Sequence, residues 1–258
     1  MSDRRAVSAP ARVELSGVSV YHGAVAALDG VDLVVGAGER VALVGPSGAG
    51  KTTLLSLVGA ATSPTSGRVT VFGSSPSELG RVERRALRRR IGMMYQQLPL
   101  PGSLRVVHNV NAGRIGQWST WRAITSLVRP REVADVQRAL DVLGIGDKLW
   151  RRTDELSGGE RQRVALARLV VQGAELVLAD EPTANLDPAR ARDVLGSMAA
   201  VAADGDRTLL VSLHAFDLAV EFFDRVVGLR DGQVMFDLPA GEVTHAHADG
   251  LYRLGTVS

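Results

Sequence analysis

The stretch "GPSGAGKT", residues 45–52, decides the fold of this chain. It follows the apolar run "RVALVG" at 40–45 and precedes the helical pattern "TLLSLVGA", so it connects a strand to a helix. Its spacing matches the pattern G-x-x-x-x-G-K-[ST], in which glycines let successive backbone N–H groups face phosphate oxygens. A glycine-rich turn without a ligand is the plain alternative, but a lysine and a threonine at the required positions disfavour it. The loop therefore predicts a nucleotide-binding strand–helix unit.

Two side chains of this loop have specific roles in the pattern. Lys51 would bridge the β- and γ-phosphates of a nucleotide, and Thr52 would ligate Mg²⁺ through its hydroxyl. The helix that follows would add the positive end of its dipole. These residues specify a bound nucleotide, but they do not specify what its hydrolysis is used for.

Strand and helix patterns alternate along the rest of the chain. Strands are expected at 13–21, 31–35, 40–45, 68–73, 91–96, 175–182 and 208–214. Helices are expected at 81–90, 133–143, 160–171 and 189–203, and a final hairpin should turn at Asp231-Gly232. The predicted fold class is α/β, with antiparallel strands at the start and a helical insert in the middle.

Composition excludes several other classes of protein. The chain has 258 residues, 45% of them hydrophobic and 22% charged, and it contains no cysteine for a disulfide or a thiolate metal site. No uncharged apolar run approaches the roughly 18 residues of a membrane span. The pI of 9.4 reflects arginine, because lysine occurs only at Lys51 and Lys148, and the formal net charge is only +2. We therefore expect a cytoplasmic protein that does not bind nucleic acid.

Two adjacent carboxylates end a buried strand pattern in "ELVLADEP", residues 175–182. Asp180, at the strand end, suits a contact to Mg²⁺, either directly or from the second shell. Glu181 projects beyond the strand, where it could accept a proton from an attacking water; a positioned base of this kind contributes about 10²–10⁴-fold to a rate. Ordinary surface acids are the alternative, which the four apolar residues before them disfavour.

The stretch "LSGGE", residues 156–160, opens another helix. Ser157 and Glu160 have the spacing of a capping box, and a helix start is by itself a sufficient explanation for them. Gly158 and Gly159 are poor helix formers in a first turn. Their presence is explained if an anionic ligand closely approaches the N–H groups of this turn.

Taken in order over about residues 12–241, these motifs resemble those of the nucleotide-binding subunits of ABC transporters. The phosphate loop is similar to the Walker A motif, and "LVLADE" is similar to the Walker B strand. The resemblance places Tyr21 where such subunits have an aromatic residue that stacks on adenine. Gln96 stands at the position of the Q-loop glutamine, and His214, after the strand "TLLVSL", at that of the switch histidine. The stretch "NLD" at 185–187 is similar to the D-loop.

The resemblance implies a P-loop NTPase (RecA-like) core with an antiparallel β subdomain and an inserted helical subdomain at about 97–165. It implies an N-terminal tail at 1–11, an ABC ATPase domain at 12–241 and a short C-terminal tail at 242–258, whose polar stretch "THAHADG" is expected to be solvated. "LSGGE" resembles the LSGGQ signature of the family, with Glu160 in place of the commoner glutamine.

The resemblance also implies a head-to-tail homodimer, in which each ATP lies between the Walker A loop of one subunit and the signature helix of the other. Glu181 would polarise the attacking water, while Lys51, Mg²⁺, Ser157 and His214 would stabilise charge on the γ-phosphoryl group. The implied catalytic residues are Glu181, His214, Lys51 and Gln96, and the implied Mg²⁺ contacts are Thr52, Gln96 and Asp180. The implied ATP contacts are Tyr21, Gly45, Pro46, Ser47, Gly48, Ala49, Gly50, Lys51, Thr52, Thr53, Ser157, Gly158, Gly159 and Asp187.

Within the expected helical subdomain, "GRIGQWSTWR" at 113–122 is most similar to the ATPase subunits of phosphonate importers. Trp118 and Trp121 step at helical spacing with Thr125 and Val128. A helix that carries them could belong to the core of the subdomain, or it could contact a membrane partner, where Trp and Arg are favoured anchors.

This subfamily resemblance implies ATP-driven uptake of a phosphonate or a related phosphorus oxyanion. The chain would lie at the cytoplasmic face of the membrane, bound to integral permease subunits and working indirectly with an extracytoplasmic solute-binding protein. An ATPase subunit for another solute, such as an amino acid, a lipid or a lipoprotein, has the same motifs and is the main alternative. A soluble ABC-type ATPase that acts on DNA or ribosomes is disfavoured, because Lys51 and Ser157 leave no room between them for a long coiled coil.

Overall fold

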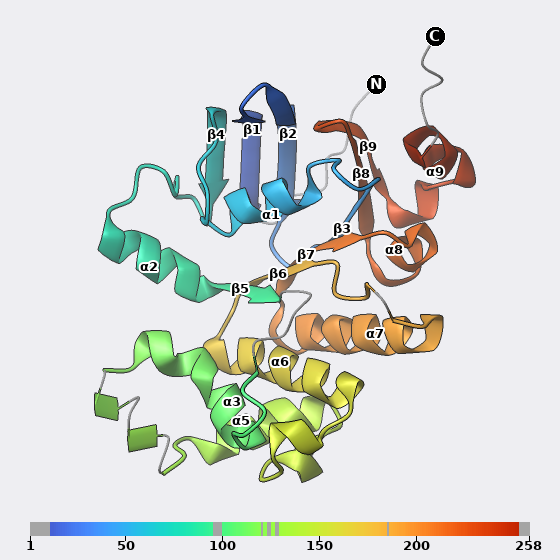
Figure 1. Cartoon of the computed structure of the whole chain (residues 1–258). Helices are drawn as coiled ribbons and strands as arrows, with labels where there is room; N and C mark the ends of the chain where they lie inside the picture. Colours follow the sequence, from blue (N-terminus) through green and yellow to red (C-terminus); the bar gives the residue numbers. More distant parts are fainter. Residues whose placement is uncertain are drawn as a thin grey trace, which may run out of the picture. The chain divides into compact units, whose positions relative to one another are not determined.

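The computed structural model of the chain describes residues 11–94, 100–119, 121–122, 125–126, 129–184 and 186–252 (Figure 1). The chain forms two compact units. The first combines residues 1–87 with residues 208–258, and the second contains residues 88–207. The second unit is therefore inserted in the sequence of the first, and the helical subdomain expected at about 97–165 falls within it.

An antiparallel sheet forms the first part of the first unit. It consists of β1 (Ala11–His22), β2 (Val25–Gly36) and β4 (Ser66–Val71), in the order β2-β1-β4. Leu15 of the central strand lies opposite Leu33 on one side and Val69 on the other, and all three side chains are buried. Burial of apolar side chains on one face is the usual way in which an antiparallel sheet gains stability. The antiparallel strands predicted at the start of the chain are confirmed.

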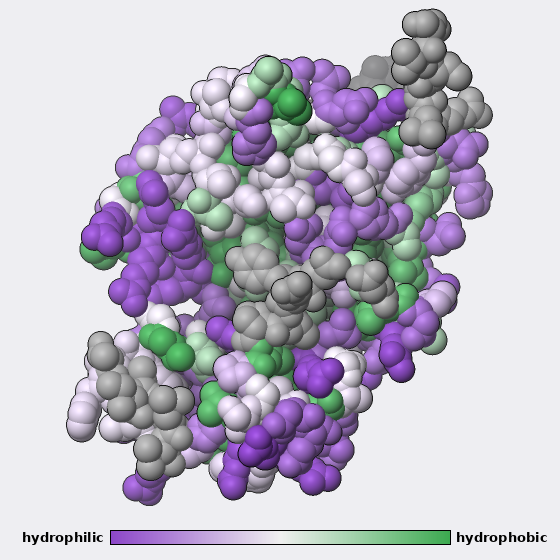
Figure 2. All heavy atoms as spheres, in the orientation of Figure 1, coloured by the Kyte–Doolittle hydropathy of each residue, from purple (hydrophilic) through white to green (hydrophobic). Residues whose placement is uncertain are grey.

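The basic run after β4 forms α2 (Arg81–Arg90). Hydrophilic side chains gather over this helix in Figure 2, and among its residues only Leu87 is buried. Arg90 forms an ion pair with Glu175 in which Nε and Oε1 are 2.5 Å apart. The helix predicted at 81–90 is confirmed, and nearly all of it faces solvent.

The parallel strands of the first unit position the nucleotide loop. They are β3 (Arg40–Val44), β7 (Thr208–Leu213) and β8 (Arg225–Arg230), with β3 parallel to both of the others. All six residues of β7 are buried, as expected of a parallel strand covered on both faces. The antiparallel strand β9 (Gln233–Pro239) follows β8. Residues Asp231 and Gly232 of the turn have φ values of 51° and 78°, which confirms the hairpin predicted there.

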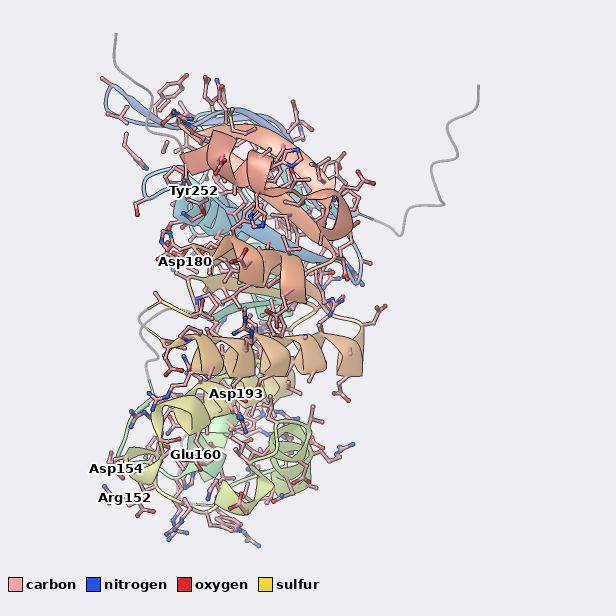
Figure 3. All side chains as sticks on the ribbon, turned by 90° about the vertical axis from the view of Figure 1, so that its right-hand side faces the viewer. Arg152, Asp154, Glu160, Asp180, Asp193 and Tyr252 are labelled. Atoms are coloured by element: carbon pink, nitrogen blue, oxygen red, sulfur yellow. The ribbon has the colours of Figure 1, made fainter. Side chains whose placement is uncertain are left out.

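Three helices and a short 3₁₀ segment complete the described part of the first unit. The helices are α1 (Lys51–Val58), α8 (Phe216–Phe222) and α9 (His245–Tyr252), and the 3₁₀ segment is η4 (Ala240–Glu242). Figure 3 labels Tyr252, the last residue of α9. Residues expected to form a solvated C-terminal tail therefore include a helix.

Helices make up most of the second unit, around the parallel pair β5 (Ile91–Met94) and β6 (Leu176–Asp180). The helix α6 packs against α3, α5 and α7, and its residues Val164 and Ala167 are fully buried. The predictions at 133–143, 160–171 and 189–203 are confirmed as α5, α6 and α7. The α-helices and 3₁₀ helices described in this unit are α3 (Val106–Asn111), η1 (Ala112–Gln117), α5 (Val133–Val142), η2 (Gly146–Lys148), η3 (Thr153–Glu155), α6 (Gly158–Gln172) and α7 (Pro188–Gly205).

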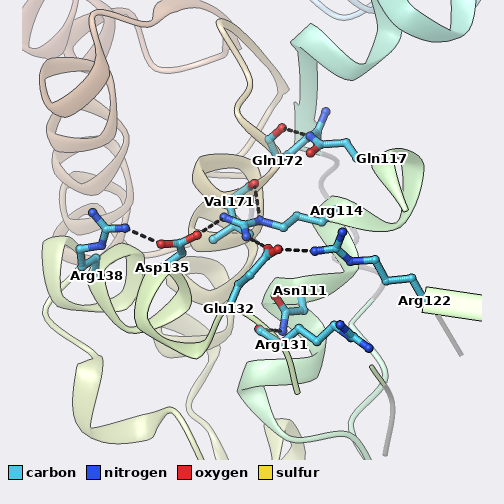
Figure 4. Close-up of polar contacts among 10 residues, drawn as sticks. All are labelled: Asn111, Arg114, Gln117, Arg122, Arg131, Glu132, Asp135, Arg138, Val171 and Gln172. Atoms are coloured by element: carbon cyan, nitrogen blue, oxygen red, sulfur yellow. Dashed lines mark hydrogen bonds and ion pairs between the residues drawn. The ribbon is translucent and has the colours of Figure 1, made fainter. Parts of the chain in front are cut away.

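Arg114 is the centre of an ion-pair network that joins η1 to α5 and α6 (Figure 4). Its guanidinium pairs with Glu132, donates to Asp135 Oδ2 at 2.7 Å, and donates to the carbonyl oxygen of Val171 at 3.2 Å. Arg122 also donates to Glu132, at 2.7 Å. Only 16% of the Arg114 side chain is exposed, so these contacts form with little competition from water.

The segment that follows the network does not form the single helix predicted from the spacing of the tryptophans. One helix through Trp118 and Trp121 is the wrong prediction, because Trp118 follows η1 with an extended backbone (φ −92°, ψ 152°). Trp121 and Arg122 are helical, whereas Val128 lies outside the described residues. The guanidinium of Arg122 lies 5.5 Å from the centre of the Trp118 ring and forms a cation–π contact with it. The two residues make this contact although they do not belong to one continuous helix.

Replacing Arg114 with methionine should destabilise the chain by about 1–2 kcal/mol at pH 7, because two partly exposed carboxylates each lose one of their two guanidinium partners. Hydrogen bonding from Arg114, and then from Arg138, lowers the pKa of Asp135. A lowered folded-state pKa stabilises the fold above the unfolded-state pKa, and this contribution disappears as pH falls through the folded-state value. The difference between wild type and variant should therefore shrink below about pH 4.

Urea unfolding at several pH values measures this difference. Arg129→Met is the matched control, because Arg129 is an exposed arginine of the same segment with no side-chain ion pair among the residues described. Equal losses of unfolding free energy in the two variants would contradict the role of the network. A difference between wild type and Arg114→Met that does not change with pH would also contradict it.

Candidate nucleotide site

The phosphate loop follows β3 directly and requires glycine at two positions. Gly45 has φ 155°, and a Cβ there would lie 2.1 Å from the carbonyl oxygen of Leu229. Gly50 has φ 103°, and a Cβ there would lie 2.4 Å from the carbonyl oxygen of Ala27. Neither approach is possible for any other residue, so the tight curl of the loop depends on these glycines. This curl is the geometry that an N–H cradle for phosphate needs.

Lys51 lies inside the loop at the start of α1. Its side chain is buried, and Nζ donates to the carbonyl oxygens of Gly45 at 2.7 Å and Pro46 at 3.0 Å. Gly50, the residue before the helix, provides no side-chain cap to the first N–H groups of α1. Uncapped N–H groups and a nearby ammonium together form a site for an anion. The hydroxyl-bearing residues Ser47 and Thr52 are exposed beside it.

His214 follows the neighbouring strand. Val44, the last residue of β3, lies opposite Leu213, the last residue of β7, so Gly45 and His214 come after adjacent strand ends. Tyr21 is 46% exposed near the end of β1, and its backbone N–H donates to Thr65 Oγ1 at 3.2 Å. The structure thus brings the loop and His214 together and leaves the ring of Tyr21 accessible for stacking.

In the second unit, Asp180 ends β6 and Glu181 begins a turn. The backbone of Glu181 has φ 49°, in the left-handed region that residues other than glycine rarely adopt. Its carbonyl oxygen accepts a hydrogen bond from the N–H of Ala184 at 3.1 Å, which closes the turn. Strain of this kind, about 1–3 kcal/mol, concentrates at active sites. The turn, rather than the strand, sets the direction in which the Glu181 side chain leaves the sheet.

The signature stretch forms the capping box predicted from its sequence. Glu160 N–H donates to Ser157 Oγ at 3.3 Å, and Ser157 N–H donates to Glu160 Oε2 at 2.8 Å. Hydrogen bonds from Ser157 lower the pKa of Glu160, and Lys148 at 3.5 Å acts in the same direction. A Cβ on Gly158 would meet no described atom within 4 Å, and one on Gly159 would reach only Asp193, at 3.9 Å. Packing among the described residues therefore does not require these glycines.

A cavity of about 500 Å³ adjoins this first turn of α6. Its lining includes Gly158, Gly159, Arg161, Arg190 and one acidic residue, Asp154, so two guanidinium-bearing residues, one carboxylate and a helix N-terminus border the same space. Such a combination suits an anionic group. Sequence patterns alone did not single out Arg190, because its relation to the glycines depends on the packing of α7 beside α6.

The remaining predicted residues are placed as follows. Asp187 precedes α7 and accepts a hydrogen bond from Arg190 N–H at 3.0 Å, so it is a helix cap. Gln162, in the second turn of α6, donates to the carbonyl oxygen of Pro182 at 3.4 Å and so joins the signature helix to the Glu181 turn. Gln96, predicted to contact Mg²⁺, lies outside the described residues.

Comparison with known proteins identifies the family. The family described as ABC transporter matches residues 28–184. Phosphonates import ATP-binding protein PhnC 2 of Pseudomonas aeruginosa is 49% identical over 241 residues, which are 93% of this chain and 90% of that protein. Phosphonates import ATP-binding protein PhnC 1 of Pseudomonas syringae pv. tomato is 44% identical, over 93% of this chain and 91% of that protein.

Solved structures have the same fold. The dimeric structure of the ATP-binding cassette MJ0796, in a post-hydrolysis state bound to ADP and Pi, has a TM-score of 0.70 and 28% identity and covers 88% of this chain and 98% of that one. The structure of cbiO1 from Clostridium perfringens has a TM-score of 0.79 and 24% identity and covers 93% and 92% of the two chains. The fold, the motifs and these matches agree: the chain belongs to the ABC transporter family, as one of its ATP-binding ATPase subunits.

Proposed function

We propose that this chain is the ATP-hydrolysing subunit of an importer for phosphonate or a related phosphorus oxyanion. The observation that carries the proposal is the 49% identity to a phosphonate import ATP-binding protein over 93% of the chain. The identity extends beyond the nucleotide motifs, which all ABC ATPases have in common. The segment 113–122 lies within the region that aligns with this relative. The sequence of this segment also indicated the phosphonate importer subfamily.

The residues that the motifs predict would bind MgATP. The glycine-lined curl and Lys51 would hold the β- and γ-phosphates, and Tyr21 would stack on the adenine. Thr52 and Asp180, with Gln96, would hold Mg²⁺, which neutralises charge on the phosphate oxygens. Glu181 would accept a proton from the attacking water, and His214 would stabilise the charge that develops on the γ-phosphoryl group.

A head-to-tail homodimer would complete each site. The cavity beside Gly158 and Gly159 offers an N-terminal helix turn and two arginines to an anion, and no packing contact among the described residues explains its glycines. We therefore assign this surface to the γ-phosphate held by the partner subunit. Asp187, next to the same surface, would lie at the contact between the two subunits.

The membrane would be reached through partner subunits. Every helix in the described part of the chain is too short or too polar to span a bilayer. The proposed location is the cytoplasmic face of the membrane, bound to permease subunits that receive solute from an extracytoplasmic binding protein. Trp121 supports a contact of this type, because 75% of its surface is exposed although it is a large aromatic residue.

Trp121→Ala should weaken binding to the permease about tenfold or more, because tryptophan is enriched among the hot spots of protein interfaces. ATP affinity and the unfolding midpoint should not change, since the side chain contributes little to the core. Co-purification with the permease and its titration measure the effect. Trp150→Ala is the matched control, because Trp150 is 51% exposed in the same unit. Loss of folding by Trp121→Ala would instead favour a core role.

Growth on a defined phosphorus source tests the proposed substrate class. A deletion strain should not grow on methylphosphonate or on phosphite, tested separately, and the wild-type gene but not Glu181→Gln should restore growth. Normal growth of the deletion strain on both compounds, in a host without a second importer, would contradict phosphonate uptake. The alternative, an ATPase for another solute, would then account for the same motifs.

A further inference from the structure

The helix α9 packs against the β8–β9 hairpin of its own unit. Leu251 is buried, and Arg230 of β8 donates from Nη1 to the carbonyl oxygen of Gly250 at 3.0 Å. The rings of Phe236 on β9 and His247 on α9 are 5.3 Å apart. These contacts give α9 a fixed position, which its polar sequence would not give it in isolation, because an isolated helix of eight residues is unstable in water.

This position brings the hydroxyl of Tyr252 to the backbone of His214. The hydroxyl donates to the carbonyl oxygen of His214 at 3.2 Å. Burial raises the pKa of the Tyr252 phenol, and the nearby backbone of Gly45 acts in the opposite direction. Gly45 opens the phosphate loop after β3, and His214 follows the neighbouring strand β7. The Tyr252 side chain therefore bonds to the residue that follows β7, beside the start of the phosphate loop.

We propose that Tyr252 is a positioning residue for ATP hydrolysis, which holds the backbone of His214 in place after β7. The inference rests on the role proposed above for His214. Tyr252 acts through His214 and is not itself assigned a contact to the nucleotide. The carbonyl of His214 comes directly after a fully buried strand, so holding that oxygen limits the directions in which the imidazole can point.

Tyr252 can affect hydrolysis because a group that stabilises charge on the γ-phosphoryl group must be oriented accurately. A donor that faces a developing charge is effective only when it is held in place before the reaction, because no energy is then used to reorient it. The strands β3 and β7 are fixed by their ladder, but the residues after them lie beyond its last pair, Val44 and Leu213. A hydroxyl that bonds to the carbonyl oxygen of His214 extends this fixed arrangement by one residue beyond β7.

Tyr252→Phe should lower kcat for ATP about two- to tenfold, the loss expected for one neutral hydrogen bond, with a KM for ATP within twofold of wild type. The ring of this residue, which is 37% exposed, and the buried Leu251 stay in place, so the unfolding midpoint should not change. A double-mutant cycle with His214→Ala separates positioning from general damage. In the His214→Ala background, Tyr252→Phe should have no further effect on kcat.

A second readout does not depend on turnover. The chain has five histidines, so the imidazole signals of ¹⁵N-histidine-labelled full-length protein can be assigned by substitution. Tyr252→Phe should shift or broaden the His214 signal, while the signals of His22 and His108 stay in place. His108 is the internal control, because it belongs to the other unit.

The outcomes distinguish this inference from the function on which it rests. An unchanged kcat in Tyr252→Phe, or an equal loss with and without His214, would overturn the positioning role. An unmoved His214 signal would also overturn it. Full ATPase activity in His214→Ala, or no activity in wild type, would instead refute the role proposed for His214 or for the chain.

Discussion

Glu181→Gln should bind ATP with wild-type affinity and hydrolyse it about 10²–10⁴ times more slowly, the contribution of a positioned general base. Glutamine keeps the size and hydrogen-bonding reach of the side chain, but its amide cannot accept the proton of the attacking water. With ATP and Mg²⁺ present, the variant should accumulate as a dimer, because the nucleotide that joins the subunits is no longer removed. Phosphate release and size exclusion with light scattering measure the two effects.

The backbone conformation of Glu181 supports a catalytic role for its side chain. A residue with φ 49° would be most stable as glycine, because glycine enters the left-handed region without a steric penalty. Glu181→Gly should therefore be more stable than Glu181→Ala by about 1 kcal/mol, while both are inactive. Thermal unfolding of the two variants measures this difference. Equal stabilities would show that the turn holds no strain.

Glu160→Gln is the matched control for Glu181→Gln, since it makes the same chemical change in the signature stretch. Glutamine at the third helical position also completes a capping box, so the start of α6 should be preserved. Hydrolysis by Glu160→Gln should stay within a few-fold of wild type. Hydrolysis by Glu181→Gln within about tenfold of wild type would remove Glu181 from the role of base.

Local sequence rules predicted the parts of the fold that depend on neighbours in the chain. The Asp231-Gly232 hairpin, the strand that ends at Asp180 and the capping box of Ser157 and Glu160 follow from backbone preferences and from hydrogen bonds within four residues. The phosphate loop belongs to the same group, because its glycines and its lysine are adjacent in sequence.

Features that depend on distant contacts could not be predicted in this way. Helical spacing placed Trp118 on one helix with Trp121, but the contacts of Arg114 with Asp135 and Val171 hold the preceding segment as η1. The polar residues of α9 carry little helical signal, and the burial of Leu251 stabilises them. The assignment of Glu181 was possible from its sequence motif, whereas its left-handed backbone requires knowledge of the turn.

Lys51→Ala should reduce ATP affinity by at least about 30-fold, because truncating one partner of a buried charge pair costs about 2–5 kcal/mol. In the present structure the ammonium is buried and bonded to the carbonyl oxygens of Gly45 and Pro46. It is therefore already inside the loop, at the place where the β- and γ-phosphates are expected. ATP binding followed by equilibrium dialysis gives the affinity without requiring turnover.

The chain offers a matched control, because it contains only one other lysine. Lys148→Ala removes the same charge from the surface of the second unit, where Nζ contacts Asp147 at 2.9 Å. If general attraction between a basic protein and ATP explained binding, both variants would lose affinity equally, and the loss would fade at high salt. A site-specific role predicts instead that Lys148→Ala binds ATP like wild type. It also predicts that the loss in Lys51→Ala persists in salt, because a buried ammonium is little screened.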